Sequence, residues 1–213
     1  MTTKKANKQN ISYHHGDLHD ALIAAAITLI KEKGPNAFSM REVAKKAGVS
    51  HNAPYRHFAD RAALLHAIAR LGFQALTARL AEAIAEHPEA PRRQLLDAGI
   101  AYVELAVENP EITQIMFGGF IDPETCLETL PGDDVNAFSG LIEIIENGVS
   151  KGHFRQDDPQ NLALAAWSMV HGLAMLITSG QIPAMENSQQ VREIALMVKT
   201  CLLEGILATP TEQ

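Results

Sequence analysis

The stretch FSMREVAKKAGVS, residues 38–50, decides the fold of this chain. Ser39 is followed three residues later by Glu42, and this pair forms the capping box that opens a helix. Gly48 then ends the helix, since glycine readily adopts the left-handed backbone found at a helix C-terminus. Ser50, at the end of a three-residue turn, is a good cap for a second helix. Two short helices joined by so tight a turn predict a helix-turn-helix.

The second short helix is expected to run from His51 to about Phe58, so that the motif spans residues 39–58. Such a motif places the N-terminal turn of its second helix in a DNA major groove, which is about 12 Å wide. Pro54 departs from this pattern because it removes a helical donor and crowds the carbonyl of Ser50. Either the helix accepts proline in its first turn or it begins one or two residues later, which leaves the base-reading residues open.

Outside this motif the apolar residues follow a helical period, and no alternating run bounded by turn residues indicates a strand. A first helix is expected from Asp17 to Gly34, and a fourth from Asp60 to about Pro88, with a length of roughly 40 Å. Further helices are expected near residues 91–109, 112–118, 135–149, 159–180 and 191–205, with a loop over residues 118–134. The sequence therefore predicts an all-α protein of about nine helices, in which a three-helix bundle is joined by the long fourth helix to a C-terminal helical domain.

Charge is unevenly distributed along the 213 residues, whose net charge is −7. Residues 1–70 contain 11 lysines and arginines against 5 acidic residues, whereas the remainder contains 7 basic and 20 acidic residues. An acidic protein with a basic first third suggests that a polyanion is held at one end only. A solvated basic face without a partner is the alternative, and charge alone does not decide between the two.

Several classes of protein are disfavoured. Cys126 and Cys201 match no zinc or disulfide spacing, which suits a reducing cytoplasm, and the polar first ten residues predict no signal peptide. The longest apolar stretch is interrupted by polar residues, so no membrane span is expected. We find no glycine-rich phosphate loop, paired carboxylates or metal-ligand set, so no catalytic residue, metal or cofactor is expected and an enzyme is disfavoured.

The helix-turn-helix and its flanks, over residues 13–77, resemble the TetR family of transcription regulators. The likeness rests on residues 38–50, on Tyr55-Arg56-His57-Phe58-Ala59-Asp60-Arg61 and on Leu64-Leu65. It combines cap, turn, aromatic and basic positions, which makes it far more specific than a bare helix-turn-helix.

A weaker likeness points to one TetR subgroup. Trp167-Ser168-Met169-Val170-His171-Gly172 resembles the W-x-x-x-H-G signature of its WHG-type C-terminal domain, and the opening Tyr13-His14-His15-Gly16-Asp17-Leu18 also resembles that subgroup. The resemblance implies a flexible basic arm over residues 1–12, a DNA-binding domain over 13–77 and an effector-binding and dimerisation domain over 78–213.

The resemblance implies a cytoplasmic homodimer that regulates transcription, most often as a repressor. Two recognition helices would enter successive major grooves of a palindromic operator, with half-sites about 34–36 Å apart or a multiple of it. A small apolar effector would bind the C-terminal domain and release the DNA. The alternative is an effector-free, DNA-bound structural or division-control protein on the same fold.

The DNA contacts implied by the resemblance lie in the N-terminal domain. Tyr55 and Arg61 align with positions that contact phosphates, although Tyr55 could also be a core aromatic. Asparagine pairs with adenine and arginine with guanine, which suits Asn52 and Arg56 to base contacts. The predicted set is Ser39, Arg41, Ser50, His51, Asn52, Tyr55, Arg56, His57 and Arg61.

The C-terminal helices carry two further expectations. Residues 162–178 are apolar on nearly every side and therefore need to be buried. A homodimer through the last two helices would bury them, and complete burial within the monomer is the alternative. Methionine and aromatic side chains line adaptable pockets, although core packing is the alternative. The predicted effector pocket is lined by Met116, Phe117, Phe120, Trp167, His171 and Met175.

Overall fold

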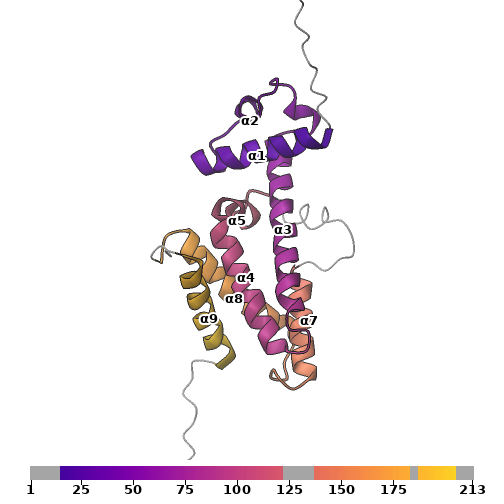
Figure 1. Ribbon diagram of the computed structural model, residues 1–213, viewed down its shortest axis with the longest axis vertical. Helices are drawn as coiled ribbons and strands as arrows, with labels where there is room; N and C mark the ends of the chain where they lie inside the picture. The colour runs from indigo at the N-terminus through magenta and orange to yellow at the C-terminus, as the bar shows by residue number, and fades with distance from the viewer. Residues whose placement is uncertain (1–14, 122–136, 183–186, 205–213) are drawn as a thin grey trace, which may run out of the picture. The chain divides into compact units, whose positions relative to one another are not determined.

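The computed structural model describes residues 15–121, 137–182 and 187–204, and every regular element within these ranges is a helix (Figure 1). This confirms the all-α prediction. The chain divides into two compact units, Met1–Ile68 and Ala69–Gln213, and the boundary falls within helix α3 (Arg61–Ala85). Each unit has its own buried apolar residues, so each is described separately below.

The first unit is built from α1 (His15–Lys33), α2 (Met40–Lys46), the 3₁₀ helix η1 (Pro54–Arg56) and the start of α3. Helix α1 packs against α2, and α2 packs against η1. Apolar residues at helical spacing form the core: Leu22, Ala26, Ile30, Val43, Ala44, Phe58, Leu64 and Ile68. The helix-turn-helix is therefore held by side chains that the helical period marks in the sequence.

The predicted capping box is present at the start of α2. The backbone N–H of Glu42 donates to Ser39 Oγ at 3.3 Å, and the backbone N–H of Ser39 donates to Glu42 Oε2 at 2.9 Å. The Lys33 ammonium also binds the Glu42 carboxylate, at 2.5 Å. The hydrogen bonds that this carboxylate accepts from Lys33 and from the hydroxyl and backbone N–H of Ser39 lower the pKa of Glu42 to about 2. Gly48 follows α2 with φ +71°, in the left-handed region where only glycine is unstrained.

The prediction of an α-helix from His51 to Phe58 is wrong. The chain instead makes a turn over residues 51–53 and then the short 3₁₀ helix η1. Pro54 has no N–H to donate to the carbonyl of Ser50, which accepts from Ala53 N at 2.9 Å instead. The 3₁₀ bonding of η1 begins at the Ala53 carbonyl, which accepts from Arg56 N at 3.2 Å. The Pro54 carbonyl then accepts from His57 N at 3.0 Å and from Phe58 N at 2.9 Å.

The second unit contains the rest of α3 and five more α-helices among its described residues: α4 (Pro91–Glu108), α5 (Pro110–Phe117), α7 (Ala137–Ser150), α8 (Pro159–Thr178) and α9 (Ser188–Glu204). Helix α4 is central and packs against α5, α7, α8 and α9 (Figure 1). The Asp158 carboxylate caps α8 by accepting from Gln160 N at 3.0 Å, ahead of Pro159 at the first helical position. Most of the loop expected over residues 118–134 lies outside the described residues.

Candidate functional site

The first unit exposes most of the side chains that the sequence assigns to DNA contact. Tyr55 is 55% exposed, which is high for an aromatic residue and shows that it is not a core side chain. Pro54 beside it is fully buried and anchors the turn. The exposed members of the predicted set are Ser39, Arg41, Ser50, His51, Asn52, Tyr55 and Arg56.

His57 and Arg61 are placed differently from the other seven. His57 is half-buried, and its ring centroid lies 6.1 Å from that of His19. Arg61 is also half-buried; its guanidinium donates to the carbonyl of Pro35 and lies 4.8 Å from the ring centroid of Phe38. These contacts tie the start of α3 to the segment between α1 and α2.

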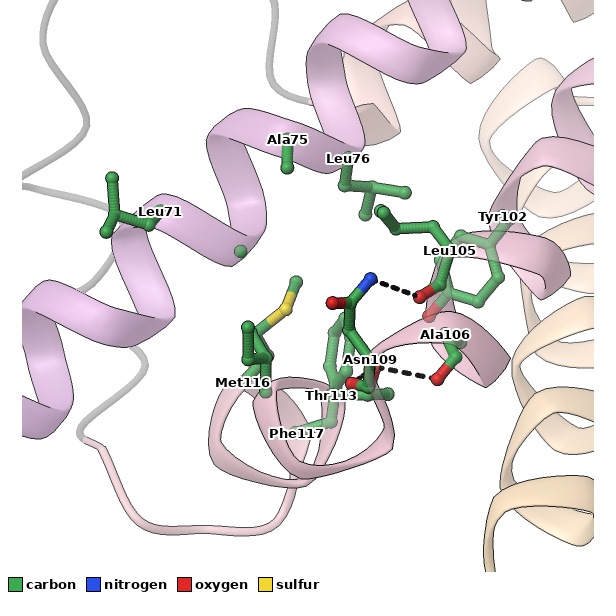
Figure 2. Close-up of a pocket in the computed structure, with 12 residues that line it drawn as sticks. Leu71, Ala75, Leu76, Tyr102, Leu105, Ala106, Asn109, Thr113, Met116 and Phe117 are labelled. Atoms are coloured by element: carbon green, nitrogen blue, oxygen red, sulfur yellow. Dashed lines mark hydrogen bonds between the residues drawn. The ribbon is translucent and has the colours of Figure 1, made fainter. Parts of the chain in front are cut away.

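The second unit contains an apolar cavity of about 530 Å³, within the range typical of small-molecule sites. A smaller cavity of about 240 Å³ shares Leu76, Tyr102, Met116 and Phe117 with it. Figure 2 shows Leu76 from α3, Tyr102 from α4 and Met116 from α5 around the smaller cavity. The larger cavity is lined by residues of α3, α4, α5, α7, α8 and α9.

The predicted pocket residues fall into two groups. Met116, Phe117 and Trp167 line the larger cavity. His171 is linked to it through a 2.8 Å hydrogen bond between its Nδ1 and the hydroxyl of the lining residue Tyr102. Phe120 and Met175 are half-buried and lie outside the residues described as lining either cavity.

Tyr102 and His171 form a polar contact within an aromatic cluster. The His171 ring centroid lies 4.8 Å from that of Phe117 and 5.8 Å from that of Trp167. Burial lowers the pKa of His171 and raises the pKa of Tyr102 to about 12, so both side chains are neutral near pH 7. A neutral hydroxyl and imidazole in apolar surroundings can orient a ligand by hydrogen bonding.

Lys199, on α9, also lines the larger cavity and is not among the pocket residues predicted from the sequence. It is 2% exposed, and its ammonium donates to the carbonyl of Leu95. Burial lowers its pKa to about 7, against a smaller opposite effect of Asp97. The signal in the sequence is register: Val191, Ala195 and Lys199 recur every four residues on the buried face of α9.

Helices α8 and α9 also expose large apolar side chains. Leu164 and Leu176 of α8 are 50% and 47% exposed, and Leu196 and Met197 of α9 are 44% and 55% exposed. Helix α8 is long and apolar enough to cross a membrane by length and composition, with a mean hydropathy of 1.4 and a third of its residues buried. It packs against α4, α7 and α9.

Comparison with known proteins identifies the family. The model for bacterial regulatory proteins of the tetR family matches residues 22–68, and a tetracyclin repressor-like C-terminal domain model matches residues 95–198. The chain belongs to the TetR family of regulators, and its N-terminal motif is the helix-turn-helix of that family. The C-terminal match does not name the WHG-type subgroup, which stays a prediction.

Solved structures with the same fold cover nearly the whole chain. A protein of unknown function from Rhodococcus sp. RHA1 is 30% identical, covering 92% of this chain and 99% of its own, with a TM-score of 0.77. The TetR family transcriptional regulator PfmR from Thermus thermophilus is 25% identical over 88% and 99%, with a TM-score of 0.69. The fatty acid degradation regulator FadR from Bacillus halodurans shares the fold at 18% identity over 92% and 100%, with a TM-score of 0.73. No curated protein matches the chain significantly.

Proposed function

We propose that this chain is a cytoplasmic, homodimeric transcription regulator that binds a palindromic operator as a repressor and leaves it when a small effector binds. One observation carries the proposal: seven predicted DNA-contacting residues are exposed together on the helix-turn-helix of a TetR-family chain. The side chains suit the task, since asparagine and arginine read base edges, while serine, tyrosine and arginine bind phosphate oxygens.

The proposed dimer is supported by four large apolar side chains that α8 and α9 expose, Leu164, Leu176, Leu196 and Met197. A large apolar surface rimmed by polar residues marks an interaction site. A two-fold axis beside α8 and α9 would bury these side chains against their own copies and fix the separation of the two helix-turn-helix motifs.

The proposed effector site is the 530 Å³ cavity, which favours an effector-controlled regulator over the effector-free alternative. Helix α3 contributes to both units, because Leu64 lies in the core of the first and Leu76 lines the cavity of the second. It also fits closely on α5, since a Cβ at Gly72 would lie 2.4 Å from Met116 Sδ. An effector that repacks this contact would favour one orientation of α3 over another, and so shift the population that binds DNA.

The experiment that tests the function is selection of genomic fragments by the full-length protein, followed by fluorescence anisotropy on the selected duplexes at several salt concentrations. We expect enrichment of palindromic sites and release by compounds that raise the melting temperature. Absence of duplex binding even at low ionic strength would contradict the proposal. If none of the compounds that stabilise the protein releases the DNA, the effector-free alternative is favoured.

A further inference from the structure

The strongest unexplained feature of the second unit is a lysine buried in the wall of an apolar cavity. Lys199 is one of the largest fully buried side chains, together with leucine and isoleucine residues. Burying an ammonium costs free energy unless it is paired, and the two preceding buried positions of this face of α9 are valine and alanine. Packing alone would be better served by an apolar residue at position 199.

The space for Lys199 comes from a glycine on the facing helix. A Cβ at Gly99 of α4 would lie 2.1 Å from Lys199 Nζ and 2.3 Å from Cδ. Any other residue at position 99 would therefore displace the amine. Gly99 and Lys199 both line the 530 Å³ cavity, so the pair places a cationic group at its wall.

The ammonium lacks a carboxylate partner among the described residues. Its one described hydrogen bond is to the carbonyl of Leu95, whereas an ammonium has three N–H donors. The carboxylate that acts on it electrostatically, Asp97 of α4, is engaged elsewhere, with Arg93 at 2.8 Å and with His87 at 3.5 Å.

We propose that Lys199 binds the carboxylate of an amphipathic monocarboxylic acid, whose apolar body fills the cavity and which is the effector of the proposed regulator. This inference rests on the proposed function, because it names the chemical class of that effector. The rest of the wall is almost entirely apolar, with Phe138, Leu141 and Trp167 available to the apolar body. A single buried cation matches one negative charge, whereas a phosphate dianion or a larger polar headgroup would lack partners.

Trp167 is the only tryptophan of the chain and lines the same cavity as Lys199, so its fluorescence reports binding directly. The probes are sodium decanoate and decan-1-ol, which share an alkyl chain and differ in the charged group, both below their aggregation limits. We expect the full-length wild-type protein to bind decanoate about tenfold more tightly than decanol. Lys199→Met should lose this preference while retaining decanol affinity.

Two further variants keep the test decisive. Gly99→Ala retains the lysine but places a Cβ where its amine lies, so it should also lose the preference for decanoate. Lys151→Met removes a lysine whose side chain is 36% exposed and binds Glu89, and it should behave as wild type. Because the wild-type comparison of acid with alcohol needs no variant, poor folding of Lys199→Met would not block the test.

The inference is overturned if wild type binds decanol as tightly as decanoate, binds neither, or if Lys199→Met keeps the preference. DNA binding of the ligand-free proteins, measured in parallel, separates this result from the proposed function. If the protein binds duplex DNA but does not prefer decanoate, only the proposal of a carboxylic acid effector is rejected. If it does not bind duplex DNA, the proposal of a transcription regulator is rejected.

Discussion

In the first unit the polar side chains of the candidate site, such as Asn52 and Arg56, are exposed, whereas in the second unit Tyr102 and Lys199 are almost entirely buried. An exposed polar group costs little to keep and gains energy only when a partner displaces its water. A buried one affects folding even without a partner. Changes in the first site should therefore alter DNA binding and leave stability unchanged, whereas changes in the cavity should alter stability and its pH dependence.

The largest effect is expected outside both of these sites, at the exposed apolar side chains of α8 and α9. Leu196→Glu puts a charge into the proposed dimer interface and should yield monomers, lowering operator affinity by about 100-fold, because two linked half-site contacts become independent. Leu71→Glu is the matched control, since Leu71 is 43% exposed and Leu196 is 44% exposed. Light scattering gives the mass and anisotropy the affinity. A dimeric Leu196→Glu protein would exclude this interface.

The next largest effect belongs to the exposed site. Asn52→Ala should weaken discrimination at one base pair of each half-site by about 1–3 kcal/mol, because it removes a bidentate amide, and should leave the melting temperature unchanged. Binding to a randomised half-site library measures the effect position by position. Gln74→Ala, an exposed amide on α3 in the other unit, is the control. Equal weakening on every sequence would show that Asn52 does not read a base.

The two sites also differ in how much of them could be predicted from the chain. The capping box of Ser39 and Glu42 is local, so two residues three positions apart suffice to predict it. The sequence shows that Pro54 cannot donate the helical hydrogen bond to the Ser50 carbonyl. Which donor replaces it depends on the conformation of the preceding turn, in which the Ser50 carbonyl accepts from Ala53 N. The burial of Lys199 depends on the room left by Gly99, which is distant in the sequence. The sequence pattern of α9 alone does not predict that room.

Arg61 is an intermediate case, since it was predicted to contact phosphate and its guanidinium binds the Pro35 carbonyl. Arg61→Ala should lower the free energy of unfolding by about 1 kcal/mol, through loss of that hydrogen bond and of the contact with Phe38. Arg56→Ala, at an exposed position, should leave stability unchanged and reduce the salt slope of DNA binding by about one. Chemical denaturation and salt titration measure the two effects. An unchanged salt slope in Arg61→Ala would remove it from the phosphate contacts.

A pH dependence of stability is the effect that only the buried site should show. Lys199 has an ordinary pKa of 10.5 when unfolded and about 7 in the folded protein, so between these values the unfolded chain binds more protons. The contribution of this group to the free energy of unfolding therefore rises as the pH increases from about 7 towards 10. Below pH 7 the amine is protonated in both states, and the full cost of burying its charge lowers stability. Lys199→Met lacks the titration, so the melting temperature of wild type should rise relative to the variant over this range. A difference that stays constant with pH would show that the buried amine keeps its ordinary pKa.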